Sequence, residues 1–122
     1  MDDRAIQLEK RTSKFGESAI QFCKSVKPNL INNPLINQFV KSSTSIGANY
    51  IEANSGSSKK DFANKVCIAK KEAEESKHWL KMFLKSEPNK MQEIKVSYRE
   101  CQELTLIFGK ILNTIRNSKI DQ

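Results

Sequence analysis

The stretch "EESKHW" places Glu75 and His78 three residues apart, on one face of any helix that contains them. Di-iron four-helix bundles carry this glutamate and histidine pairing on two of their helices. Such a site needs a second histidine, and His78 is the only histidine in the chain. The sequence therefore does not favour a di-iron site, and we expect a solvated or interface pair with no metal and no other cofactor.

Three cysteines are the other reactive side chains, at Cys23, Cys67 and Cys101. They are odd in number, far apart, and lie within apolar helical patterns, which favours packed thiols over a disulfide framework or a metal site. A catalytic nucleophile also needs a positioned base, and the single histidine beside Trp79 is a weak candidate. No catalytic residues are assigned, and we expect a protein that is not an enzyme.

The string "GSSKK" begins at Gly56 and raises the question of phosphate binding, because free amides at a helix N-terminus bind anions. It lacks the spacing of a Walker loop. We interpret Gly56 as a helix stop and Ser58 as the N-cap of the next helix. Anion contact at this turn is the alternative.

Basic side chains indicate an anionic partner, since the net charge is +7 with 21 Lys and Arg against 14 Asp and Glu. The aromatic residues mostly fall on apolar core positions, so base stacking is not indicated and contact with a nucleic-acid backbone is expected. Ordinary solvated helix faces are the alternative. The candidate nucleic-acid-binding residues are Lys10, Arg11, Lys14, Lys59, Lys60, Lys65, Lys70 and Lys71.

Four amphipathic segments must position these residues, because apolar residues recur with a helical period in four parts of the chain. The predicted helices run from Arg4 to Lys27, from Pro34 to about Ser55, from the cap at Ser58 to the break before Pro88, and from Lys90 to about Ser118. Strand signals are absent. Short connections force neighbouring helices to be antiparallel, so we predict an all-α, up-down-up-down four-helix bundle.

The helix ends and the chain length complete this expectation. Asn33 is expected to cap the second helix, with Pro34 in its first turn. At 122 residues, the chain 1–122 is expected to form one domain. No run approaches the roughly 20 apolar residues of a membrane helix, and the start lacks the apolar block of a signal peptide, so we expect a cytoplasmic protein without a membrane partner.

Two features of the helices suggest contacts beyond a simple core. The fourth helix has a wide apolar face between Leu104 and Leu112, which either broadens the core or, as we favour, forms an interface between copies of the chain. Gly47 in the second helix is expected to allow close approach of another backbone. Polar residues flank the core stripes of the second and third helices, and these flanks are expected to meet between helices or subunits, with Asn49 and Glu52 forming hydrogen bonds. The residues are Ser42, Ser45, Asn49 and Glu52 on the second helix and Glu72 and Trp79 on the third.

Residues Ser42 to Leu80, "SSTSIGANYIEANSGSSKKDFANKVCIAKKEAEESKHWL", resemble the signature of a bacterial four-helix bundle family. That family includes proteins encoded in intervening sequences of large-subunit ribosomal RNA genes. The pieces "SIGAN", "KDF", "KEA" and "WL" recur in order. The similarity covers the second and third predicted helices in residue type and spacing, whereas the first and fourth agree in pattern.

The resemblance implies a homopentameric ring of bundles. It also implies distant kinship with the accessory variability determinant of diversity-generating retroelements, which uses a basic ring to bind nucleic acid and a reverse transcriptase. By position, Ser45, Asn49, Glu52 and Glu72 are implied to form a structural hydrogen-bond network. The acidic start of this chain and the pair Glu74 and Glu75 depart from a continuous basic surface.

Two functions follow as hypotheses. In the first, a non-enzymatic bundle assembles into a ring and binds RNA or DNA, or an enzyme that acts on them, through lysine and arginine. In the second, the ring is a structural or adaptor assembly that binds a protein partner, and the positive charge only maintains solubility.

Overall fold

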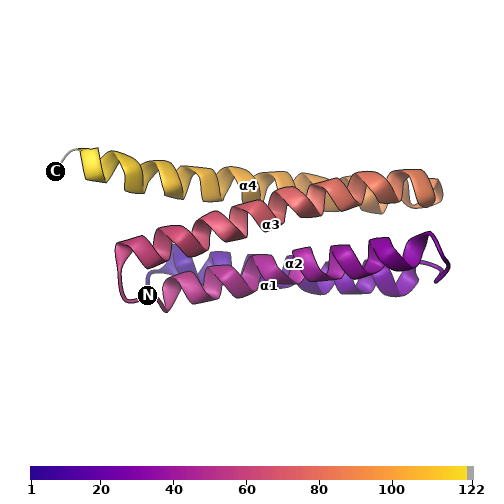
Figure 1. Ribbon diagram of the computed structural model, residues 1–122, viewed down its shortest axis with the longest axis horizontal. Coiled ribbons are helices and arrows are strands. Elements are labelled where there is room, and N and C mark those ends of the chain that lie inside the picture. The colour runs from indigo at the N-terminus through magenta and orange to yellow at the C-terminus, as the bar shows by residue number, and fades with distance from the viewer. Residues whose placement is uncertain (121–122) are drawn as a thin grey trace.

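Four long helices make up the protein in a computed structural model that describes residues 1–120. They are α1 (Asp3–Ser25), α2 (Asn32–Asn54), α3 (Lys59–Ser86) and α4 (Met91–Ile120), and a short 3-10 helix η1 (Pro88–Lys90) precedes α4 (Figure 1). Within the described residues there is no strand, so the all-α prediction is confirmed. None of these helices combines the length and apolarity needed to cross a bilayer.

The helices run up and down in sequence order. α2 packs along both α1 and α3, and α3 also packs along α4, whereas α1 and α4 meet over a short length only. α1 and α3 are diagonal, so their backbones do not come close, although Phe22 and Phe83 meet between them in the core. In Figure 1 the last turns of α4, drawn in yellow, diverge from the start of α3, whereas Phe108 further back on α4 is fully buried. The bundle is therefore closed at one end and open at the other.

An aromatic cluster fills the closed end of the core. Phe22 and Phe83 pack edge to face with ring centroids 5.1 Å apart, and Phe39 contacts Phe83 in the same way at 5.8 Å. Such edge contacts match the positive ring edge of one aromatic to the negative face of another. The predicted core stripe of the third helix is buried throughout, apart from its half-buried first member Phe62.

Two of the predicted helix ends are as expected. Ser58 caps α3, because its hydroxyl oxygen accepts a hydrogen bond from the amide of Asp61 at 3.0 Å. α2 ends at Asn54, two residues before the predicted stop at Gly56. Gly56 has no positive φ, so it does not act through the left-handed conformation that glycine favours at helix ends.

The predicted cap at Asn33 is wrong. α2 begins at Asn32, and the side chain that satisfies its first amides belongs to Asn29. The Asn29 Oδ1 atom accepts hydrogen bonds from the amides of Ile31 at 3.0 Å and Asn32 at 2.7 Å. Several asparagines stand close together here, and the turn geometry, which sequence spacing does not show, decides which one caps the helix.

The wide apolar face of α4 is largely used inside the bundle. Leu104 and Phe108 are fully buried, and Ile107 and Ile111 pack against the core while half-buried. Leu106 is the exception, since it is 63% exposed. A broad core therefore accounts for most of this face.

Close approach of α1 and α2 explains Gly47. A Cβ atom at this position would lie 3.3 Å from the Thr12 hydroxyl and 3.4 Å from the amide nitrogen of Ser13, in the backbone of α1. Gly16 on the other helix is less confined, because its Cβ would meet Ser43 O and Thr44 Cα at 3.5 Å, an ordinary contact. The expectation that Gly47 admits a neighbouring backbone is confirmed.

These two glycines make a matched test of helix packing. Gly16→Ala should raise the free energy of unfolding by roughly 0.5 to 1 kcal/mol, since alanine restricts the unfolded chain and fits the space. Gly47→Ala should be less stable than Gly16→Ala by about 1 kcal/mol, because the Thr12 hydroxyl, 3.3 Å from the new Cβ, must give by a few tenths of an ångström. Urea unfolding followed by circular dichroism measures both. A Gly47→Ala protein as stable as Gly16→Ala would contradict the close approach.

Candidate nucleic-acid interface

Arg11 is not a free cation, although it was predicted to bind nucleic acid. With Lys10 and Lys14 it forms the first group of predicted residues, on α1, and the five predicted lysines of α3 form the second group. Its Nε and one terminal nitrogen each donate to Glu100 of α4 at 2.7 Å, and the same terminal nitrogen also reaches Glu103 at 3.1 Å. This bidentate contact with Glu100 raises the pKa of Arg11. Arg11 therefore joins α1 to α4, and in this chain it is committed to the fold.

The other members of the first group remain on the surface. Lys10 and Lys14 are exposed on α1, and neither forms an ion pair within residues 1–120. They lie on a helix that is diagonal to α3, where the second group is found. The two predicted groups are therefore not brought together into one surface.

The lysines of the second group divide between paired and unpaired side chains. Lys65 forms an ion pair with Glu52 of α2 at 2.6 Å, and Lys70 approaches Glu74 on its own helix at 3.7 Å. The remaining three are exposed, without an ion pair in the described part of the chain: Lys59, Lys60 and Lys71.

Charge is segregated across α3, which carries eight lysines and four acidic residues. On the flank beside α2, Glu72 is influenced by the charges of Glu75 and of Lys41 on α2. On the flank beside α4, Lys70 and Lys110 line a groove together with Glu74 and Glu103, and Lys77 and Lys81 lie further along the helix. The two sides of one helix thus present surfaces of different charge.

We call the basic flank the lysine seam and define it as Lys70, Lys77 and Lys81 of α3 with Lys110 of α4. The Lys81 Nζ atom lies 5.8 Å from the centre of the Tyr98 ring, and Lys77 lowers the pKa of Cys101, so both lie next to α4. Lys70 lies beside Gly109 and, with Lys110, lines a groove between the helices.

Sequence reasoning missed Lys77, Lys81 and Lys110. The first two follow Lys70 by seven and eleven residues, a spacing that keeps all three on one helix face. That signal was available in the sequence. What the sequence does not show is which face of α4 completes the seam, because this depends on how the two helices pack.

Some of the polar residues predicted between helices bond within their own helix, and others join two helices. Ser45 and Asn49 hydrogen-bond to their own helix, with Ser45 donating to Lys41 O at 2.7 Å and Asn49 to Ser45 O at 2.8 Å. Glu52 does join α2 to α3, through Lys65. The buried contact between these helices is made by Ser42 of the predicted stripe, whose hydroxyl lies 2.8 Å from that of Ser76.

Trp79 is half-buried beside the core, and its ring contacts His78 edge to face at 4.8 Å between centroids. Its indole nitrogen is buried without a hydrogen-bond partner in the described part of the chain. Half-burial against the core is what a structural or interface residue requires. His78 itself is exposed.

Glu72 is the acidic group whose pKa departs from its usual value. Desolvation by burial raises the pKa of this carboxyl, Glu75 raises it further, and Lys41 opposes the change. The ionised carboxylate is therefore partly uncompensated at neutral pH. In the described chain Glu72 forms no ion pair closer than 4 Å.

Two of the thiols, Cys23 and Cys101, are buried in the core. Burial raises the pKa of Cys23 to about 11 and that of Cys101 to about 12, which disfavours the nucleophilic thiolate. Cys101 donates its thiol hydrogen to Ala73 O at 3.0 Å, a contact between α3 and α4. Residues 1–120 bring no three His, Cys, Asp or Glu side chains together in a metal-binding arrangement.

The fold and the lysine seam define a small, lysine-rich four-helix bundle. The chain belongs to the 23S rRNA-intervening sequence protein family, whose model matches residues 4–110. It is similar to a crystal structure of a protein with unknown function from the S23 ribosomal protein family of Bacteroides thetaiotaomicron, with 27% identity and a TM-score of 0.75. That match covers 85% of this chain and 96% of the other. No curated protein matches the chain.

Glu72 provides a test of the electrostatics beside α2. A carboxyl with a raised pKa binds extra protons in the folded state, so the free energy of unfolding falls as the pH rises through that pKa. Glu72→Gln removes this penalty and should stabilise the protein at pH 7, by less than about 1 kcal/mol at a half-exposed position.

The gain should vanish as the pH falls below the ordinary glutamate value of 4.5, where Glu72 becomes protonated. Thermal unfolding measured from about pH 3 to about pH 8 would follow this difference across the titration of the carboxyl groups. Glu74→Gln is the matched control, since it removes a surface charge on the same helix. A stability gain for Glu72→Gln that is independent of pH would contradict the assignment.

Proposed function

We propose that this protein is a non-enzymatic, self-assembling bundle that binds the phosphate backbone of nucleic acid through the lysine seam. The charge segregation across α3 is the observation that carries the proposal. It gathers several ammonium groups on one edge of the bundle, with Glu74 and Glu103 as the neighbouring acids. Phosphate contacts made by such groups provide affinity without base specificity.

The seam has a suitable length for a nucleic-acid strand. Lys70 and Lys81 are eleven residues apart, which corresponds to about 17 Å along the helix at roughly 1.5 Å per residue. Successive phosphates of one B-DNA strand are separated by about 3.4 Å along the axis. A row of this length therefore reaches about five phosphates of one strand.

The family description agrees with a nucleic-acid context, since it names 23S rRNA, but it names no ligand. The earlier candidates Lys10 and Lys14 lie on the diagonal helix and are outside the seam. Lys71 and the lysines at the start of α3 extend the positive surface along the same helix. The proposal thus keeps α3 as the basic helix and moves the binding surface toward α4.

Self-assembly is supported by the resemblance, which implies a pentameric ring, and by large aliphatic side chains left on α4. Val96 is 64% exposed and Leu106 is 63% exposed. Burying an aliphatic side chain of this kind contributes about 1.5 to 3 kcal/mol, so a contact between copies has apolar surface to use. Copies arranged in a ring would repeat the lysine seam and raise the effective affinity for a long strand.

Nucleic-acid binding is tested by replacing two lysines of the seam. Lys77→Gln with Lys81→Gln should weaken binding of a fluorescent RNA or duplex DNA at least several-fold at low salt. The slope of log affinity against log salt should fall by about two for each bound chain, because two phosphate contacts are lost. Fluorescence anisotropy over a salt series measures both quantities.

Lys24→Gln with Lys27→Gln is the matched control, since it removes the same charge near the end of α1, away from the seam. It should change the affinity less than the seam variant does. Equal losses in both variants would indicate that only net charge matters. No binding of RNA or DNA at low salt would reject the proposal and favour a protein-binding adaptor.

Assembly is tested by native mass spectrometry and sedimentation of the full chain. A ring predicts one species with a mass of five chains, and Leu106→Lys should shift it toward smaller species if α4 forms the contact between copies. A monomer at high protein concentration would contradict self-assembly. The test of the lysine seam would remain valid in that case, because all the seam lysines belong to one chain.

A further inference from the structure

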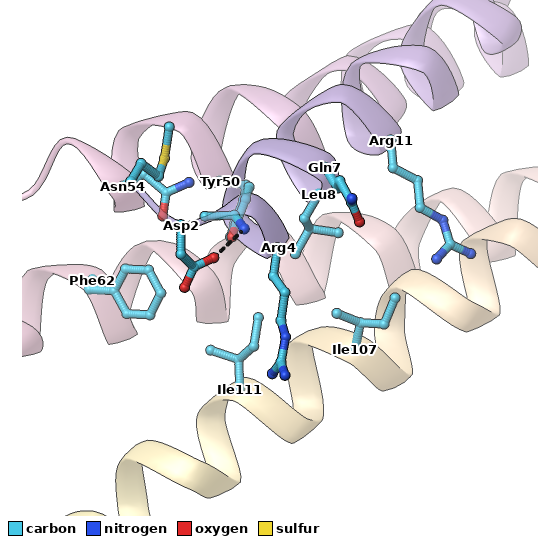
Figure 2. Close-up of a pocket in the computed structure, with 12 residues that line it drawn as sticks. Asp2, Arg4, Gln7, Leu8, Arg11, Tyr50, Asn54, Phe62, Ile107 and Ile111 are labelled. Carbon is cyan, nitrogen blue, oxygen red and sulfur yellow. Dashed lines mark hydrogen bonds between the residues drawn. The ribbon is translucent and has the colours of Figure 1, made fainter.

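A groove opens between the N-terminal part of α1 and the C-terminal half of α4, at the open end of the bundle. Its volume is about 620 Å³, within the range of about 300 to 1,000 Å³ of small-molecule pockets. Figure 2 shows that side chains from all four helices line the groove. The apolar side chains that line it include Leu8, Tyr50, Phe62, Ile107 and Ile111.

The groove is elongated along α4. A second hollow of about 560 Å³ adjoins it, because both are lined by Asn54 and Phe62. Ile107, Ile111 and Ile115 follow one another at intervals of four residues on α4, and the last lines the second hollow. A row with this spacing forms a continuous apolar strip on one helix face, which suits an extended aliphatic chain.

Most polar groups around the groove already have partners inside the protein. Asp2 Oδ1 accepts a hydrogen bond from the Ala5 amide at 2.9 Å, as Figure 2 shows. Asn54 donates to Glu9 at 2.8 Å, and Arg11 is held by its two glutamates. These groups shape the rim without offering an uncommitted charge.

Arg4 differs from them. Its side chain extends from α1 toward α4 and passes between Ile107 and Ile111 in Figure 2. Within residues 1–120 it has no acidic group within 4 Å and no side-chain hydrogen bond. One uncommitted guanidinium therefore stands beside an apolar strip, the arrangement that recognises a molecule with an apolar body and one negative charge.

We propose that this groove binds an amphipathic monocarboxylate with an aliphatic chain, such as a medium-chain fatty acid. The carboxylate pairs with Arg4, and the chain lies along the isoleucines of α4 against Phe62. Asp2, the acidic residue in the lining, limits the tolerated charge, because a ligand with several negative charges would be repelled. Binding in the groove is independent of nucleic-acid binding, since none of the seam lysines lines the groove, although Ile107 borders both.

Calorimetry on the full chain tests it with three probes of equal chain length: dodecanoate, dodecanol and dodecylamine, each below its micelle concentration. The wild type should bind dodecanoate about tenfold or more tightly than the neutral alcohol, as expected for a charge-assisted contact. It should bind the amine most weakly. Methyl NMR signals of Ile107, Ile111 and Ile115 should shift on addition of dodecanoate.

Arg4→Gln should abolish the preference for dodecanoate over dodecanol while leaving the alcohol bound. This variant alters an exposed side chain and should fold normally. Arg99→Gln is the matched control, because it removes an exposed arginine from the far face of α4 and should retain the preference. Ile111→Trp should block all aliphatic probes by filling the groove.

Several results would overturn the proposal. They are the absence of saturable binding by dodecanoate, an equal or tighter affinity for dodecylamine, an unchanged preference in Arg4→Gln, and methyl shifts confined to residues outside the groove. A groove that a second copy covers would give no binding by the assembled protein, and that outcome also counts against the proposal.

Discussion

The packing of α3 against both α2 and α4 is the constraint on which the rest of the structure depends. α1 lies diagonal to α3 and meets α4 over a short length, so the position of α4 is set chiefly by α3. Small side chains make this double contact possible: Ala69, Ala73 and Ser76 are fully buried along α3. Ser76 lies 2.8 Å from Ser42 of α2, and Ala73 O accepts from Cys101 of α4 at 3.0 Å. Larger residues at these positions would push one neighbour away and overpack the core.

Because α3 is enclosed by two neighbours, its surface is divided into two flanks with different chemistry. The flank beside α2 holds a carboxyl that burial has partly desolvated, Glu72, and the ion pair of Glu52 and Lys65. The flank beside α4 holds the lysine seam. The helical period alone decides which flank of α3 a side chain occupies, so no long-range contact is needed to separate the two groups. The proposed binding surface is thus a direct consequence of the way the helix is packed.

The same period explains what the sequence predicts and what it does not. Core positions such as Phe39, Val66 and Leu80 follow from apolar spacing alone, and the four helices and their antiparallel order follow with them. Arg11 was predicted as a free cation, because its partners are about ninety residues away and only the packed α1 and α4 bring them together. The cap at Asn29 was missed for a local reason, since neighbouring asparagines have similar propensities. Contacts set by period are predictable, whereas contacts set by the meeting of two surfaces are not.

The open end of the bundle follows from where α1 and α4 are joined. Arg11 joins them through Glu100 and Glu103, near the middle of both helices. Toward the N-terminus of α1, the structure shows no further hydrogen bond or ion pair between these helices within the described residues. A helix held at one end and at the middle keeps its direction, so α4 diverges and leaves Ile107 and Ile111 half-covered. A well-packed bundle would place a large apolar side chain from α1 over them, but α1 places the polar side chains of Arg4 and Gln7 there. The groove is therefore fixed by residue choice on α1, and the uncommitted charge of Arg4 comes from the same helix.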